Sequence, residues 1–253
     1  MICDPYKEAL PRQLALDFCV TPEQVLDKEN HFSVYEPREG RRRFRDSRET
    51  LLKIASVRGK LLFTGREDIV CRMRELYEST PGDWFFEYRA LRELEERLRP
   101  FGVRPDLVHP FYLPDRSALV PARQIETRLY EGAELERFRG DPAFDEAFAF
   151  DPDAPDLFGI GALKDGQILG MAGASADSPL LWQIGVNVSP GARQAGLASY
   201  LVSRAREEVF SRGAVPFYGT AVSHLLSQRV AARAGFLPAW AEMNTVESLP
   251  SSP

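Results

Sequence analysis

The hydrophobic residues of this chain follow two rhythms, and the change between them falls near residue 115. In the first half, two apolar runs flank Arg58-Gly59 and predict a β-hairpin, because glycine readily supplies the positive φ of a tight turn. Apolar residues at helical spacing predict helices over 66–79 and 88–98. The proline-bracketed run 108–114 predicts an extended segment. The first half is therefore predicted to be a small α/β unit.

The second half alternates strands and helices more regularly. Lys164-Asp165-Gly166 separates two apolar runs and predicts another hairpin. A later helix is predicted to begin at a Ser223 cap and to bury Leu226, and the tail from Asn244 is expected to fray. The other elements predicted in this half are strands over 124–129, 157–163, 167–175, 180–188, 215–221 and 236–243, and helices over 131–139, 141–150 and 197–212.

The clearest chemistry lies in the stretch 180–198, which reads LLWQIGVNVSPGARQAGLA. It is an uncharged strand up to Val188, then a turn, then a basic loop that opens a helix. The first amides of a helix lack partners and the helix dipole favours negative charge, so such a loop binds phosphate. Gly196 has no Cβ and lets phosphate oxygens approach the backbone closely. This stretch predicts a phosphate site.

Composition limits the classes of function. The chain has 253 residues, of which 44% are hydrophobic and 27% charged, as expected for one large or two modest globular domains. Its net charge of −5 argues against general nucleic-acid binding. The sequence has no apolar run long enough to span a bilayer and begins without a signal-peptide pattern, so we expect a cytoplasmic protein without a membrane partner. Cys3, Cys19 and Cys71 form no CxxC pair, and we expect neither a disulfide nor a metal site.

Charged residues crowd between Glu36 and Glu49, in EPREGRRRFRDSRE. The arginines could form a phosphate or nucleic-acid patch. Because acidic residues are interspersed among them, we favour a solvated loop.

The basic loop and its setting resemble the GNAT superfamily of acyl-CoA-dependent N-acetyltransferases. That family's pyrophosphate signature is Arg or Gln, two residues, Gly, one residue, then Gly or Ala. Here it stands as Arg193-Gln194-Ala195-Gly196-Leu197-Ala198, after a strand and at the start of a helix. The family's next strand, capped helix and terminal Gly-Phe follow, ending at Gly235-Phe236. The resemblance covers about the last half of the chain. It implies an α/β fold of the α+β type, with a mixed, mostly antiparallel sheet flanked by helices.

The resemblance implies a site for acetyl-CoA as co-substrate. Backbone groups of Val186 and Val188 would pair with the pantetheine arm as if it were an added strand. Their strand would bulge and diverge from the strand at 215–221, which opens a V-shaped slot. The N–H of Val186 would also stabilise the tetrahedral oxyanion. The pyrophosphate would be held by the loop residues Arg193, Gln194, Ala195, Gly196, Leu197 and Ala198, with a charge-assisted contact from Arg193.

The catalytic groups depart from the family's common pattern. Ala231 stands where the family usually has a tyrosine acid, and His224 where an asparagine meets the pantetheine. Gln183 replaces a glutamate of the central strand; it can orient a water molecule but cannot take its proton. His224, Ser227 and Gln183 are therefore the catalytic candidates, and His224 and Ser227 are also expected to contact the cofactor. Tyr218 is a further acid candidate.

Several of these residues have a structural alternative. His224 could be a helix-start histidine bonded to backbone, and Ser227 a small residue that lets the helix sit close to the cofactor. Core packing suits Trp182 and Trp240 better than a role on the acceptor side. Glu242 could be a pocket carboxylate or a surface one.

Two domains are expected, over 1–115 and 120–253. The second is the GNAT-like acyl-CoA-binding catalytic domain. The first has no pyrophosphate loop, although its hairpin and two helices loosely echo the second half. It is either a lid or substrate-recognition domain or a degenerate GNAT-like copy, and both readings place the acceptor near the junction.

The expected function is N-acetylation by direct transfer from acetyl-CoA to a primary amine of a small molecule or peptide. A non-catalytic acyl-CoA-binding or regulatory module is the alternative from another class, and the missing tyrosine and glutamate favour it. A second alternative keeps the fold and uses a longer acyl-CoA donor.

Overall fold

The computed structural model describes residues 5–42, 50–193 and 196–248, which form two compact units. The first unit contains the described residues up to 41, residues 50–111 and those from 239 onward, and the second contains residue 42 and residues 112–238. Strands β4 (Val103–Pro114) and β10 (Phe236–Glu247) contribute residues to both units. Residues 239–248, which the sequence placed in the second domain, thus pack with the first unit.

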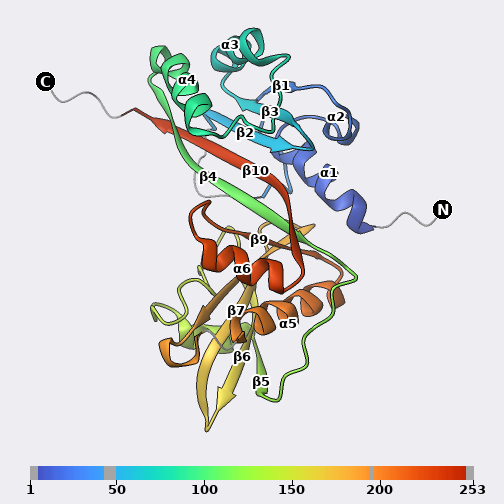
Figure 1. The fold of residues 1–253 in the computed structure, drawn as a ribbon, viewed down its shortest axis with the longest axis vertical. Helices are drawn as coiled ribbons and strands as arrows, with labels where there is room; N and C mark the ends of the chain where they lie inside the picture. Colours follow the sequence, from blue (N-terminus) through green and yellow to red (C-terminus); the bar gives the residue numbers. More distant parts are fainter. Residues whose placement is uncertain (1–4, 43–49, 194–195, 249–253) are drawn as a thin grey trace, which may run out of the picture. The chain divides into compact units, whose positions relative to one another are not determined.

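The strands of the first unit lie in the order β1–β3–β2–β10–β4 (Figure 1). The predicted hairpin is confirmed: β2 and β3 pair antiparallel around Arg58 and Gly59, whose φ angles are 54° and 80°. The other elements of this unit are α1 (Pro5–Asp17), α2 (Pro22–Leu26), β1 (His31–Val34), β2 (Leu52–Val57), β3 (Lys60–Gly65), α3 (Glu67–Tyr77), α4 (Tyr88–Leu98) and the 3-10 helix η1 (Arg99–Phe101).

Helices cover both faces of this sheet. Ile54 and Phe63 face α3 and α4, where they join a cluster of buried residues with Met73 and Leu94. The alternate residue Lys53 points to the other face and lies 5.0 Å from the ring centroid of Phe18, just after α1. The period of two along β2 therefore separates an apolar core from a face that also holds charge.

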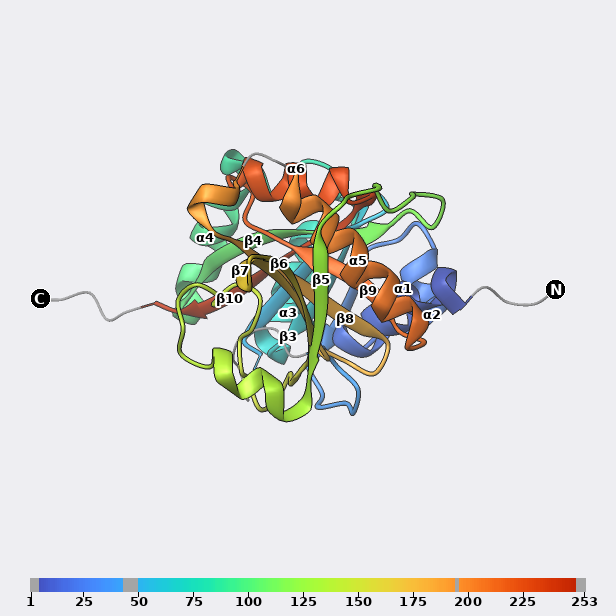
Figure 2. The same cartoon turned by 90° about the horizontal axis from the view of Figure 1, so that it is seen from below.

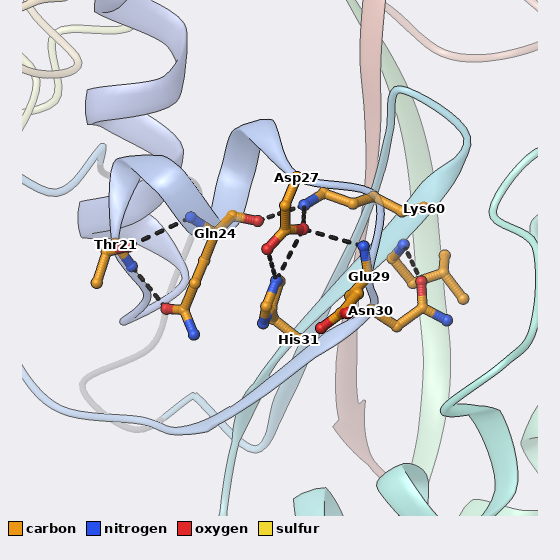
Figure 3. Close-up of polar contacts among 8 residues, drawn as sticks. Thr21, Gln24, Asp27, Glu29, Asn30, His31 and Lys60 are labelled. Carbon is orange, nitrogen blue, oxygen red and sulfur yellow. Dashed lines mark hydrogen bonds and ion pairs between the residues drawn. The ribbon is translucent and has the colours of Figure 1, made fainter.

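A polar cluster ties α2 to the sheet (Figure 3). The Lys60 ammonium, almost fully buried, lies 2.6 Å from Asp27 Oδ1, and His31 Nε2 lies 2.8 Å from Asp27 Oδ2. The Asn30 side chain accepts a hydrogen bond from the Leu61 N–H. Burial alone would raise the pKa of Asp27, but hydrogen bonds from Lys60, the Glu29 N–H and His31 lower it to about 2. The cluster satisfies its own charges.

Two arginines of the basic run, Arg38 and Arg41, are engaged within the first unit. Arg38 Nη1 reaches the carbonyls of Ala15 and Val20, and Arg41 Nη2 donates to the Asp17 carbonyl at 2.9 Å. Residues 43–49 lie outside the described residues.

The strands of the second unit lie in the order β9–β8–β7–β6–β5. Only the β8–β9 pair in this order is parallel, and β5 to β8 are antiparallel neighbours. The Lys164–Gly166 hairpin is confirmed, with φ angles of 52° at Asp165 and 76° at Gly166. The elements are β5 (Glu126–Glu131), η2 (Gly132–Phe138), β6 (Asp156–Lys164), β7 (Gln167–Ser175), β8 (Leu181–Val188), η3 (Pro190–Ala192), α5 (Leu197–Ser211), β9 (Val215–Gly219) and α6 (Leu225–Arg233).

This second sheet also has two covered faces. Ile184 packs with Leu201 and Ala205 of α5 in the larger cluster, whereas Phe138 of η2 and Phe148 pack on the opposite face. Figure 2 shows η2, in yellow-green, and the orange helices α5 and α6 on opposite sides of β5 to β8. The predicted fold class, a mixed and mostly antiparallel sheet flanked by helices, is confirmed.

The helix predicted over 141–150 is absent: that described segment consists of turns. A row of glycines paired across the sheet, Gly159, Gly173 and Gly185, holds it instead. A Cβ at Gly185 would lie 1.8 Å from the Glu146 carbonyl oxygen, and one at Gly173 would lie 2.1 Å from that of Ala147. The backbone of the segment thus lies directly on the sheet, an approach that no other residue type allows.

Two smaller predictions also fail. His224, not Ser223, is the N-cap of α6, and Leu226 is 70% exposed instead of buried. The chain does not fray at Asn244, because β10 continues to Glu247 and Asn244 pairs with Lys53. Within the described residues, no helix is long and apolar enough to cross a membrane.

Candidate functional site

Strands β8 and β9 separate partway along their length. Their pairing covers Leu181, Trp182 and Gln183 against Val215, Pro216 and Phe217, and goes no further within the described residues. On its other edge, β8 stays paired with β7 up to Val188. One edge of β8 beyond Gln183 is therefore left without a neighbouring strand in the ladder.

Two hydrogen bonds show which backbone groups face the open edge. The Ser189 N–H donates to the Leu169 carbonyl on the β7 side, and the Val215 N–H donates to the Leu180 carbonyl on the β9 side. Because backbone groups alternate along a strand, the N–H and C=O of Val186 and Val188 point toward the β9 side. These are the two residues that the sequence singled out.

The expected bulge is not there. Partners from Gly170↔Val188 to Ser175↔Gln183 follow one register without a shift. The open edge comes instead from the divergence of β9, a short strand that ends at Gly219.

The basic loop leads from this edge into α5. Gly196 is the N-cap of α5 with φ 73°, and the first helical bond runs from the Tyr200 N–H to its carbonyl. The amides of the three residues between them therefore point out of the helix end, and the first turn holds no acidic residue to meet them. Arg193 is exposed and its Nε lies 3.4 Å from the Val188 carbonyl oxygen. Of the predicted loop residues, Leu197 is buried, Ala198 is half-buried, and Gln194 and Ala195 lie outside the described residues.

A pocket of about 350 Å³ opens beside Gly196. Arg123 and Arg233 give it positive charge, and Tyr200 gives it an aromatic wall. Its lining residues are Pro121, Ala122, Arg123, Gly196, Ser199, Tyr200 and Arg233. A cationic pocket next to outward-pointing amides suits an anion that carries an apolar ring.

Buried Arg206 fixes two walls of this pocket. Its guanidinium donates to the Ala234 carbonyl at 2.8 Å, just after Arg233, and to the Ala118 carbonyl at 2.5 Å, near Arg123. Gly235, with φ 81°, leaves the room that this guanidinium fills, because a Cβ there would lie 2.6 Å from its Nη1. Arg206 is thus a structural arginine that holds the segments bearing half-buried Arg123 and exposed Arg233.

The structure brings the side chains of Ser227 and Tyr218 together. His224 is not part of this pair. The Tyr218 hydroxyl lies 2.9 Å from Ser227 Oγ, and Tyr218 is 4% exposed. His224 is exposed and its side chain makes no capping bond to α6. Ala231, where the family usually has a tyrosine, is fully buried. The two hydroxyl groups therefore come from Tyr218, next to the last β9 residue that pairs with β8, and from the first turn of α6.

Gln183 is the last residue of β8 that pairs with β9, and a buried carboxylate lies beside its backbone. Asp177 accepts a hydrogen bond from Ser175 Oγ at 2.8 Å and another from the Gln183 N–H. Burial raises the pKa of Asp177 to about 6, although the two hydrogen bonds and the charge of Arg42 oppose this. This carboxyl group was not a candidate from the sequence.

Two further candidates have structural roles. Glu242 is neither a pocket nor a surface carboxylate: its Oε2 lies 2.9 Å from the ammonium of buried Lys53, and its Oε1 accepts from Trp240 Nε1 at 2.7 Å. Trp240 also stacks on Phe111 at 4.9 Å between centroids, and Trp182 packs against the main core of the second unit. The predicted core roles of both tryptophans are confirmed.

Sequence reasoning missed Arg123, Tyr200 and Arg233 of the pocket. Arg233 lies in the Ala231–Phe236 segment that carries the family's Gly-Phe ending, and its charge was the available signal. Nothing local marks Arg123, which comes from an irregular segment far from α5 in sequence. Among the described residues, no group of three or more His, Cys, Asp or Glu side chains is placed to hold a metal ion.

Residues 120–236 match the model of the Acetyltransferase (GNAT) family. No curated protein matches the chain.

Three solved structures illustrate what the chain is similar to. A GCN5-related N-acetyltransferase-like protein from Streptococcus suis is 18% identical over 94% of this chain and 98% of its own, with a TM-score of 0.46. A GCN5-related N-acetyltransferase from Kribbella flavida is 17% identical over 62% and 64%, with a TM-score of 0.47. A GNAT-family acetyltransferase from Colwellia psychrerythraea is 15% identical over 75% and 78%, with a TM-score of 0.44. At these values the likenesses support no detail of the site.

Proposed function

Residues 120–236 form a domain of the GNAT acetyltransferase family, and from this premise we propose that the protein moves an acetyl group from acetyl-CoA directly to a primary amine of a small molecule or peptide. The family supports acyl-CoA-dependent acetyl transfer in general. We propose acetyl-CoA as the donor, a primary amine as the acceptor, and the roles of the residues named below.

The open edge of β8 is the observation that carries the proposal. Beyond Gln183, the N–H and C=O of Val186 point to a side where β9 has diverged. The pantetheine arm contains amide groups and can pair there as an added strand. The same strand leads into Arg193 and Gly196, so the phosphates of CoA would follow the arm into the loop.

The loop and the pocket supply what the rest of CoA needs. The amides at the start of α5 and the Arg193 guanidinium would hold the pyrophosphate, with Gly196 allowing close approach. Gln194 and Ala195 remain predicted members of this loop. The pocket lined by Arg123, Tyr200 and Arg233 fits the phosphorylated nucleotide end, which has both negative charge and an aromatic ring.

Direct transfer makes three chemical demands. The amine must lose a proton, because a lysine-type amine has a pKa of about 10.4. The Val186 N–H would stabilise the oxyanion, and the sulfur must receive a hydrogen bond or a proton. His224 and Ser227 stay proposed contacts of the pantetheine arm. Gln183 would orient a water molecule at the mouth of the slot.

The first unit would select the acceptor. We propose 1–115 as a recognition domain and 120–253 as the catalytic one, except that residues 239–248 pack with the first unit. An acidic chain with net charge −5 suits a cationic amine.

The test combines binding and turnover. Titration calorimetry with acetyl-CoA should give saturable binding, and a thiol reagent should report CoA release with a panel of polyamines, amino acids and short peptides. Tight binding of acetyl-CoA without release of CoA on any amine would favour the non-catalytic module, the alternative supported by Ala231 and Gln183 in place of the family's tyrosine and glutamate. Strong preference for a longer acyl-CoA would favour a different donor. Failure of every CoA ester to bind would overturn the proposal.

A further inference from the structure

The family's usual acid position is filled by Ala231, which is fully buried and has no proton to give. A thioester whose carbon–sulfur bond breaks leaves a thiolate, and a nearby donor speeds that departure. The second unit must therefore supply such a donor from another element if the proposed transfer takes place.

Tyr218 lies at the point where the slot opens. Its neighbour Phe217 is the last residue of β9 that pairs with β8, opposite Gln183. The Tyr218 side chain lies in the same buried cluster as Ile184, and Val186 packs against that cluster. The tyrosine ring thus lies on the face of the sheet to which Ile184 and Val186 point, next to the strand edge along which the pantetheine arm is proposed to pair.

Ser227 fixes the direction of the Tyr218 hydroxyl. The two oxygens lie 2.9 Å apart, and Ser227 belongs to the first turn of α6, one turn before Ala231. A phenol that is 4% exposed and bonded to one serine has few orientations available. This seat on α6 places the phenol beside the helix from which the family's tyrosine usually comes.

The surroundings keep the phenol protonated. Burial raises the pKa of Tyr218, and the charges of Glu146 and Tyr112 raise it further, while the bond with Ser227 opposes the rise. Glu146 belongs to the turn segment held on the opposite face of β8, where Asn187 Oδ1 accepts from its N–H at 3.0 Å. A protonated hydroxyl is what a departing thiolate requires.

We propose that Tyr218, seated by Ser227, is the donor to the sulfur of CoA in this protein. This inference rests on the proposed acetyl transfer. The amine nitrogen bonds to the thioester carbon, the carbon–sulfur bond breaks, and its electron pair leaves on sulfur. The phenol gives its proton to the sulfur and regains the proton that the amine lost, so the products are an amide and a free thiol.

The test needs no acceptor, because CoA and desulfo-CoA differ only at the sulfur. Both affinities are measured by calorimetry at pH 9, where a larger share of a thiol is ionised than at pH 7, since even the cysteine thiol has a pKa of about 8.5. The unaltered protein should prefer CoA about tenfold, as expected for a hydrogen bond to a charged sulfur. Tyr218→Phe should remove that preference and leave the affinity for desulfo-CoA unchanged.

Two further variants complete the experiment. Tyr130→Phe removes a hydroxyl from another buried tyrosine of the same unit and should keep the preference. Ser227→Ala keeps the phenol of Tyr218 but removes its hydrogen-bond partner, and should reduce the preference for CoA over desulfo-CoA in part. This variant provides the test if Tyr218→Phe unfolds and so loses binding of both ligands.

The outcomes separate the two proposals. If neither ligand binds the unaltered protein, the proposed function falls and this inference with it. If both bind, and a Tyr218→Phe variant that stays folded by circular dichroism changes the two affinities equally or changes neither, the proposed function stands and Tyr218 is not the donor. If Tyr218→Phe unfolds, an unchanged preference in Ser227→Ala leads to the same conclusion.

Discussion

The two buried lysines of the first unit are paired within the fold, whereas the second unit leaves a strand edge and a helix start open to a ligand. In the first unit, Lys53 is paired with Glu242 at 2.9 Å and Lys60 with Asp27 at 2.6 Å, so each buried ammonium has its partner inside the fold. In the second unit, the edge of β8 beyond Gln183 has no neighbouring strand within the described residues, and α5 begins without an acidic side chain. Internal pairing is the mark of a structural cluster, whereas unfilled capacity is the mark of a ligand site.

The carboxylates repeat this contrast. A lysine, a backbone N–H and a histidine lower the pKa of Asp27 to about 2, whereas burial raises that of Asp177 to about 6. A stabilised charge makes Asp27 part of the scaffold. Asp177 carries a charge that the fold stabilises poorly, at the turn that leads into β8.

The largest expected effect comes from breaking a pair in the first unit. Lys53→Met would leave Glu242 buried without its cation and should lower the free energy of unfolding by about 3–5 kcal/mol. Urea unfolding measures this loss. Lys53→Met with Glu242→Gln, which keeps an acceptor for Trp240, should recover most of it. A loss below about 1 kcal/mol for the single variant would show that the pair is not a scaffold element.

A pH effect of similar order is expected in the second unit. Because the folded pKa of Asp177 is above its unfolded value of 3.8, the folded state holds the proton more tightly. Stability from this group is present below pH 3.8 and falls by about 3 kcal/mol as pH rises through 6. Asp177→Asn should flatten the unfolding free energy between pH 4 and 6.

Asp27 has the opposite sign and serves as the internal comparison. Its pKa is lowered, so its contribution is present above pH 3.8 and is lost as pH falls toward 2. Asp27→Asn should therefore leave the slope between pH 4 and 6 unchanged. If the unfolding free energy of Asp177→Asn depends on pH between 4 and 6 as steeply as that of the unaltered protein, the raised pKa of Asp177 is contradicted.

A somewhat smaller effect is expected on binding. Gly196→Leu places a side chain at φ 73° where the phosphates are proposed to lie, and should weaken CoA binding on the order of 100-fold through lost amide contacts. Gly166→Leu is the matched control, since Gly166 has φ 76° and open space around it in a hairpin turn. Both should cost similar stability, about 1–2 kcal/mol. Equal CoA affinity in the two variants would show that the loop does not hold the ligand.

The parts of the fold that could be predicted depend on neighbouring residues. Arg58-Gly59 and Asp165-Gly166 predict their hairpins because tight turns need residues that adopt positive φ. The motif from Arg193 to Ala198 predicts the start of a helix. The failures depend on distant partners. The segment 141–150 is not helical because Gly185 and Asn187, about forty residues later, hold its backbone. Glu242 could not be assigned because Lys53 lies far away in sequence.

The candidate site also has parts that neighbouring residues predict and parts that depend on distant contacts. Val186, Val188 and Gly196 follow from a motif and from the alternation of a strand. The contact between Tyr218 and Ser227 depends on how α6 lies against β9, and the walls of the pocket depend on buried Arg206. Both are tertiary facts that a pattern along one chain does not contain.

The most direct measurement is amide hydrogen exchange along β8 with and without saturating CoA. Val186 should exchange at least tenfold more slowly when CoA is bound, because its N–H would gain a strand partner. Gly185 and Asn187, whose amides face β7, should be protected equally in both states. An unchanged rate at Val186 in protein that calorimetry shows to be saturated with CoA would contradict the assignment of the open edge as the CoA site.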